Sequence, residues 1–235
     1  GDDTTSVLNI IHDEIMERTS AELKATDISE FLWASASLNF VPDSGCLDML
    51  QERALHRMPD FSAAEISKMA WGLACHMPTL QLMPSFLDEV AEAALSKLSG
   101  FTPQGLSNLM LAYASFKNNQ PALLYAVEQQ TMSIFSQCNG QDVSNLLHAF
   151  HRLRYTPSVA LLAMVEVFLQ GNISELSEEE LQKLVRALHR MGYVPEPDVR
   201  DAVKQRLESD ASLSPEVVGN ISWSLGEMEA TAEAY

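Results

Sequence analysis

The chain has 235 residues and a mass of 26.0 kDa. Its residues are 46% hydrophobic and 20% charged, which is typical of a folded domain and excludes disordered and collagen-like proteins. The longest apolar stretch, residues 158–169, is interrupted by Glu166 and is too short to span a bilayer, so we expect no membrane span. Cys46, Cys75 and Cys138 contain no CxxC pair, which excludes a disulfide scaffold and a four-cysteine zinc site. The net charge of −17 disfavours non-specific binding to nucleic acid, because phosphate contacts dominate that affinity.

The chain repeats itself every 37 to 40 residues. Six apolar anchor residues recur along it, with spacings of 38, 40, 37, 38 and 37 residues: Ile28, Ile66, Leu106, Val143, Leu181 and Val218. The anchor and the residues three, four and seven positions after it are mostly apolar, which is one face of a helix. The residue six positions after each anchor is small, which allows close approach of a neighbouring helix: Ala34, Gly72, Ala112, Ala149, Ala187 and Ser224. We therefore predict an array of repeats, each beginning with a helix.

Residues that start helices precede several anchors. Ser62 with Glu65, and Ser177 with Glu180, have the spacing of a capping box. Thr102 precedes a proline, the pattern of a cap residue followed by proline at the first helical position, and residues 214–215 repeat it. These start signals agree with a helix at the beginning of each repeat.

A second amphipathic segment follows the first in each repeat, for example at residues 85–98, 122–135, 158–169 and 198–207. No stretch shows strand alternation with hairpin turns. Helical pairs of this length bury their apolar faces only by stacking, so we predict an all-α fold, an α-solenoid of helix–turn–helix repeats of 37–40 residues. A compact helical bundle is the alternative, but it gives no reason for registered repeats.

The boundaries of the repeats predict one solenoid array over residues 1–235. Residues 1–24 would be a partial leading repeat, residues 25–214 five helix-pair repeats, and residues 215–235 the first helix of a further repeat.

The segment from Phe101 to Ala114, FTPQGLSNLMLAYA, resembles the F-x-P-Q-x-L-A-N-L-L-W-A-L-A signature of octotricopeptide repeats. It is also similar to the related repeats of FAST-kinase-like proteins, and residues 68–74 and 145–150 match the pattern more loosely. The resemblance covers about residues 25–235. It implies a soluble α-solenoid of mitochondria or chloroplasts that binds organellar transcripts and affects their stability, processing or translation.

The polar side of the first helices carries the candidate binding residues. Two, five, eight and nine positions after the anchor, the fourth and fifth repeats are rich in basic residues. Because neighbouring helices pack about 8–10 Å apart, we expect these two sets to lie together and to hold phosphates or stack on bases of single-stranded RNA. Asparagines on this side would read a base edge, since an amide offers a donor and an acceptor. The predicted RNA-binding residues are Lys68, Asn108, Asn145, His148, His151, Arg152, Lys183, Arg186, His189 and Arg190.

Each of these assignments has a structural alternative. The basic residues would instead form a solvated face paired with the acidic residues 178–180. The asparagines would instead form hydrogen bonds between adjacent repeats, and we favour that interpretation slightly. Trp33, Trp71 and Trp223 would serve as stacking platforms, or would fill the seam between repeats, which is the interpretation we prefer.

Motifs of catalysis are not found in the sequence. It contains no HExxH, no glycine-rich phosphate loop, no GxSxG turn and no clustered cysteine–histidine pair, so we expect no catalytic residue, metal, cofactor or small-molecule substrate. We predict a non-enzymatic protein that binds organellar RNA, with protein partners in a ribonucleoprotein or organellar complex. The alternative is a protein–protein scaffold or structural subunit of a large organellar complex, which the net charge favours.

Overall fold

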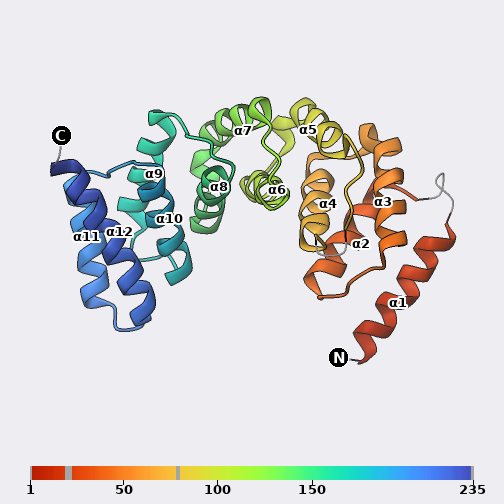
Figure 1. The fold of residues 1–235 in the computed structure, drawn as a ribbon, viewed down its shortest axis with the longest axis horizontal. Helices are drawn as coiled ribbons and strands as arrows, with labels where there is room; N and C mark the ends of the chain where they lie inside the picture. Colours follow the sequence, from red (N-terminus) through yellow and green to blue (C-terminus); the bar gives the residue numbers. More distant parts are fainter. Residues whose placement is uncertain (1, 19–22, 78–79, 234–235) are drawn as a thin grey trace. The chain divides into compact units, whose positions relative to one another are not determined.

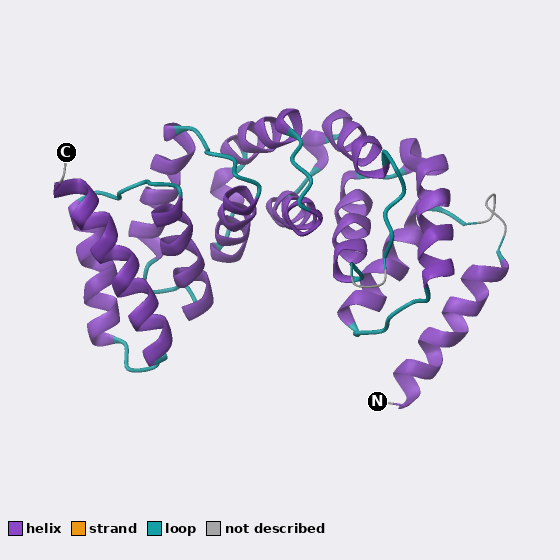
Figure 2. Ribbon diagram, viewed as in Figure 1, coloured by secondary structure: helices purple, strands orange, loops and turns teal. Residues whose placement is uncertain are grey.

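The computed structural model describes residues 2–18, 23–77 and 80–233, and these residues form twelve α-helices with no strand among them (Figure 1; Figure 2). The helices are α1 (Asp2–Glu17), α2 (Ala25–Ser37), α3 (Ser44–Arg57), α4 (Ala63–Cys75), α5 (Phe86–Ser96), α6 (Pro103–Phe116), α7 (Pro121–Ser133), α8 (Gly140–Arg152), α9 (Val159–Asn172), α10 (Glu178–Arg190), α11 (Pro197–Ser209) and α12 (Pro215–Glu233). They follow one another as helical pairs that pack on their neighbours. The predicted all-α solenoid is therefore confirmed.

The chain divides into two compact units, residues 1–127 and 128–235. In the first unit α2 packs against α4, and α4 against α6; in the second unit α8 packs against α10, and α10 against α12. The first helices of consecutive repeats are thus direct neighbours within each unit. One array over residues 1–235 stays a prediction, as does its division at residues 24 and 214. Residues 19–22 and 234–235 of its terminal segments lie outside the described residues.

The predicted helix starts are formed by side-chain caps. The hydroxyl oxygen of Ser62 accepts a hydrogen bond from the backbone N–H of Glu65 at 3.3 Å, and the carboxylate of Glu65 accepts one from the N–H of Ser62 at 2.7 Å. Ser177 and Glu180 form the same pair of bonds at the start of α10. Thr102 caps α6, with a proline at its first position. Because these caps recur at the repeat period, consecutive first helices begin in register.

Small residues let the first helices approach at backbone distance. A Cβ atom on Gly72 of α4 would lie 2.6 Å from the carbonyl oxygen of Leu32 in α2, closer than real Cβ atoms come to any atom. On the other side of α4, the buried hydroxyl of Ser67 donates a hydrogen bond to the carbonyl oxygen of Gly105 in α6 at 3.0 Å. At Gly72, the small residue six positions after the anchor therefore has the packing role that the sequence predicts.

A buried glutamate joins consecutive repeats in the second unit, an interaction that the sequence analysis does not predict. Glu128, which is 2% exposed, accepts hydrogen bonds from the hydroxyl of Tyr155 and from the backbone N–H of Ser158 at 2.7 Å. It thereby holds the turn between α8 and α9. One repeat later the same pair of bonds is made by Glu166, Tyr193 and the backbone N–H of Glu196.

No helix among the described residues is long and apolar enough to cross a membrane.

Replacement of Gly72 by alanine tests the close approach of α2 and α4. The new methyl group would meet the backbone of Leu32, which cannot move aside as a flexible side chain would. We expect Gly72→Ala to lower the free energy of unfolding, because overpacking costs about 1–3 kcal/mol and the helix propensity of alanine returns at most about 1 kcal/mol. Urea unfolding followed by circular dichroism measures the change.

Gly219→Ala in α12 is the matched control, because nothing lies within 4 Å of the Cβ that it adds. It should raise the free energy of unfolding by about 0.5–1 kcal/mol. Equal effects of the two substitutions would contradict backbone contact between α2 and α4.

Candidate nucleic-acid interface

Two capped helices bring the basic residues of the second unit together. Asn139 caps α8, its side-chain oxygen accepting a hydrogen bond from the backbone N–H of Asp142 at 2.9 Å, and α10 begins at its own capping box. Because both helices begin in register and pack side by side, equivalent positions face one another. The ammonium group of Lys183 donates a hydrogen bond to the side-chain oxygen of Asn145 at 3.2 Å, and both residues stand two positions after their anchors.

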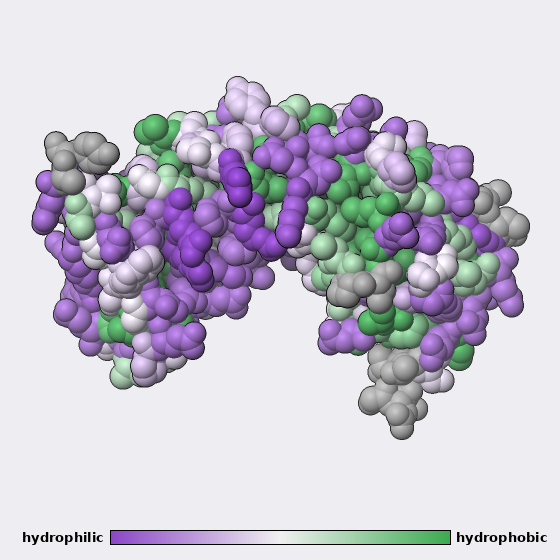
Figure 3. Space-filling view, viewed as in Figure 1, coloured by the Kyte–Doolittle hydropathy of each residue, from purple (hydrophilic) through white to green (hydrophobic). Residues whose placement is uncertain are grey.

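A groove of about 430 Å³ lies between α8 and α10, and we call it the basic groove. It is lined by His148, His151, Arg152, Glu179, Gln182, Lys183, Arg186, Ala187 and Arg190. Figure 3 shows strongly hydrophilic side chains gathered over these two helices. Six of the ten residues predicted from the sequence therefore line one groove. Their binding of RNA stays a prediction.

The three arginines of the groove have no acidic partner in the described part of the chain. Arg152, Arg186 and Arg190 are exposed, and no ion pair joins any of them to a carboxylate among the described residues. Lys183 differs, because its ammonium group lies 2.5 Å from the carboxylate of Glu179 one turn earlier on α10. The alternative of a self-paired polar face thus applies to Lys183 and leaves three guanidinium groups available for an anion.

The pKa values of two histidines in the basic groove are lowered. The pKa of His148 lies below its ordinary value, first because the ring is partly buried and then because the charges of Arg152 and Lys183 disfavour a proton there. The pKa of His151 is lowered by burial and by the charges of Arg190 and Arg186. Burial first, and the surrounding cations second, therefore favour the neutral form of both imidazoles.

Two predicted residues lie in the first unit, away from this groove. Lys68 on α4 forms an ion pair with Glu30 on α2 at 2.5 Å, and its ammonium group lies 5.8 Å from the ring centre of Trp33. Asn108 is half-buried on α6. Lys68 thus has the interactions of a contact between repeats.

The remaining two lie beside the groove in the second unit. Asn145 is 8% exposed, and its oxygen is occupied by Lys183, which agrees with the interpretation of the asparagines as links between repeats. The ring of His189 packs against that of Trp223 on α12, with 5.1 Å between the ring centres and 81° between the planes.

The tryptophans differ from the preferred interpretation. Trp33 and Trp223 are 44% and 60% exposed, whereas Trp71 is half-buried. The interpretation that they fill the seam between repeats is therefore wrong for Trp33 and Trp223. Helical periodicity places all three on the polar side but gives no measure of how far the next helix covers them.

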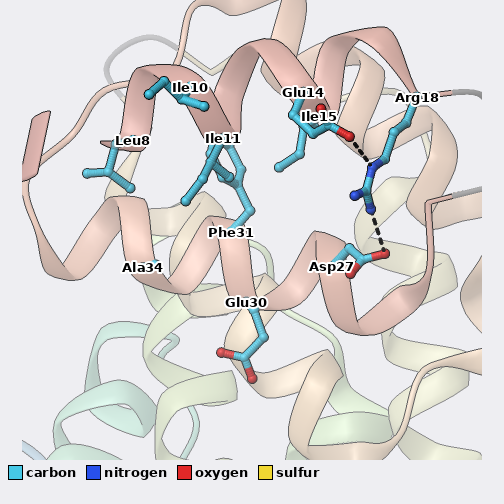
Figure 4. Close-up of a pocket in the computed structure, with 10 residues that line it drawn as sticks. All are labelled: Leu8, Ile10, Ile11, Glu14, Ile15, Arg18, Asp27, Glu30, Phe31 and Ala34. Atoms are coloured by element: carbon cyan, nitrogen blue, oxygen red, sulfur yellow. Dashed lines mark hydrogen bonds and ion pairs between the residues drawn. The ribbon is translucent and has the colours of Figure 1, made fainter. Parts of the chain in front are cut away.

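A second surface, which the sequence analysis does not identify, lies between α1 and α2, and we call it the apolar groove. It has a volume of about 430 Å³, and Figure 4 shows Leu8 and Ile11 of α1 pointing toward Phe31 and Ala34 of α2. At one end, the guanidinium group of Arg18 lies 3.1 Å from the carboxylate of Glu14 on α1 and 3.8 Å from that of Asp27 on α2. The run of isoleucines and a methionine within residues 7–16 is the sequence signal that could have located this groove, and the structure shows Ile10, Ile11 and Met16 to be exposed.

Comparison with known protein families identifies the family of this chain. The model of the family described as RNA-editing substrate-binding complex 6 protein matches residues 14–196. The chain belongs to this family. The matched region includes every residue that lines the basic groove.

One curated relative is a RAP domain-containing protein, chloroplastic, of Oryza sativa subsp. japonica. It is 24% identical over 118 residues, which are 50% of this chain and 18% of the relative. The matched region thus spans less than a fifth of the length of that relative.

The lowered pKa values predict a pH dependence of stability. In the unfolded chain both histidines take up protons near their ordinary pKa of 6.5, before the folded protein does, so the unfolded state binds more protons as the pH falls. We expect the free energy of unfolding to decrease from about pH 7.5 to about pH 5.5, and the double variant His148→Gln/His151→Gln to show a smaller decrease. Urea unfolding at the two pH values measures it. Identical pH dependence in both proteins would show that the fold does not disfavour protonation of these rings.

Proposed function

We propose that this protein binds single-stranded RNA through the basic groove, without catalytic activity of its own. The observation that carries the proposal is the set of three exposed arginines with no carboxylate partner among the described residues, in a chain with a net charge of −17. A guanidinium group presents a rigid fork of donors that matches a phosphate.

The names of the related proteins support an RNA-associated role. The matching family is named for a complex that binds the substrates of RNA editing, and the name of the rice relative places that protein in the chloroplast. We propose on this basis that the chain acts on organellar transcripts, in a mitochondrion or chloroplast, and affects their stability, processing or translation. The resemblance of residues 101–114 to octotricopeptide repeats supports the same role.

The acidic remainder of the chain constrains how RNA would bind. Few phosphates can be neutralised by one groove, so non-specific electrostatic binding should be weak. Affinity must then come from contacts with bases as well as from the arginines. Single-stranded RNA meets this requirement because its bases are free to stack on side chains, whereas the bases of a duplex are not.

A second candidate function is that of a scaffold that docks a helix of a partner protein in the apolar groove. Gly72 and Ala112, the small residues six positions after the anchor in α4 and α6, are buried by a neighbouring first helix, but the equivalent Ala34 is only half-buried. A helix with the apolar spacing of the first helices would cover Ala34. Exposed Ile10 and Ile11 on α1 enlarge this apolar surface.

Charge reversal in the basic groove tests the RNA proposal. We expect the triple variant Arg152→Glu/Arg186→Glu/Arg190→Glu to lose binding to a diverse pool of single-stranded RNA at low salt, measured by fluorescence anisotropy. For the unmodified protein, the logarithm of the binding constant should fall with the logarithm of the salt concentration at a slope of about −0.7 per phosphate, thus about −2 for three contacts.

The chain offers a matched control, because six lysines and arginines of the described residues are exposed and three of them lie outside the groove: Lys24, Lys117 and Arg154. Their replacement by glutamate changes the net charge by the same amount and should reduce binding only slightly. Equal loss in the two triple variants, or no binding by the unmodified protein at low salt, would refute the proposal. Circular dichroism of both variants checks that they fold.

A further inference from the structure

The polar side of the second unit extends past the basic groove to an indole. His148 of α8, Arg186 of α10 and Trp223 of α12 each stand five positions after their anchors. Because α10 packs against both α8 and α12, these equivalent positions follow one another across three neighbouring helices. The contact of His189 with Trp223 confirms that the indole lies beside the polar side of α10.

The indole of Trp223 has a large surface in contact with water. It is 60% exposed, more than Trp33, and within the described part of the chain no cation lies over its ring. Trp33 occupies the same position in α2 and is followed by another first helix, α4, yet it is still 44% exposed. An indole at this position therefore stays partly exposed beside a following first helix, at Trp33, although Trp71 at the same position of α4 is half-buried.

We infer that the single-stranded RNA bound by the basic groove stacks a base on Trp223. The inference rests on the proposed function and deepens it, because it gives the RNA site a second component, one that recognises bases and not phosphates. Proteins that bind single strands combine a cationic groove with aromatic side chains on which bases stack, and such stacking tolerates any sequence because every base has a π-face.

The arrangement of the neighbouring side chains fits this role. His189 contacts the indole at a steep angle, 81° between the planes, and leaves most of the indole surface accessible. Arg186 and Arg190 lie on α10, the helix that separates Trp223 from the rest of the groove. A strand whose phosphates contact these arginines therefore has an aromatic surface one helix further along.

Fluorescence of a protein with a single tryptophan tests the stacking directly. The variant Trp33→Phe/Trp71→Phe retains only Trp223 of the three tryptophans in the chain. We expect oligoadenylate to quench its fluorescence to saturation, with the dissociation constant found by anisotropy. Inorganic polyphosphate, which carries the charge without the bases, should bind more weakly and should not quench. Saturation by RNA without quenching, or equal quenching by polyphosphate, would overturn the inference.

Affinity measurements separate the indole from the arginines. Trp223→Ala should weaken binding of oligoadenylate by about 5- to 100-fold at an unchanged salt slope, because one stacked base is lost and no phosphate contact is. Trp223→Phe should restore most of the affinity. Trp33→Ala is the matched control. Trp33 has the same position in a different unit and carries a lysine over its ring, so the affinity of this variant for oligoadenylate should equal that of the unmodified protein.

The outcomes distinguish the two proposals. If the arginine triple variant loses binding while Trp223→Ala binds normally, the groove binds RNA and the stacking inference is wrong. If the unmodified protein binds no RNA at low salt, both proposals fail, and Trp223 is then better explained as part of a surface that a partner protein covers.

Discussion

The close approach of consecutive first helices is the constraint on which the remaining features depend. Apolar anchors alone would bury the helices at many angles and offsets. A small side chain six positions after the anchor lets the backbones of neighbouring first helices approach each other. At Gly72 the space does not admit even the Cβ atom of an alanine. Caps at the repeat period then fix where each helix begins. Together they align equivalent positions, so that any residue type repeated at one position becomes a continuous feature of the surface.

The basic groove is a product of this alignment. Several basic residues elsewhere in the chain pair with a carboxylate of another helix, as Lys68 does with Glu30 and Arg200 with Glu229. The basic residues at equivalent positions of α8 and α10 face other cations instead, and the charges of these cations add to burial in lowering the pKa of His148 and the pKa of His151. The acidic surface elsewhere repels polyanions, so attraction is confined to a small area. A localised potential of this kind favours ligands that offer further contacts over those that offer charge alone.

The sequence was sufficient for the solenoid, the helix starts and the grouping of basic residues, because each depends on spacing along one chain. It was insufficient where the contacts or the exposure of a side chain depend on residues of another helical turn or of another helix. Periodicity placed Lys183 on the polar side, but its pairing with Glu179 and Asn145 depends on side-chain reach. The exposure of Trp223 depends on how far the adjacent helix extends, and the links of Glu128 to Tyr155 and Ser158 join segments that share no motif. For the same reason the apolar groove, formed by two different helices, was not predicted.

Identical backbone repeats give the two units surfaces of different chemistry. Five positions after the anchor, the first unit has Trp33, Trp71 and Leu111, whereas the second has His148, Arg186 and Trp223. The apolar groove lies in the first unit and the basic groove in the second, and they share no residue. The proposed RNA binding and the proposed protein docking therefore concern different sites. Because packing is carried by the anchors and small residues, the exposed positions are free to differ, and one kind of repeat presents surfaces of different chemistry within a single chain.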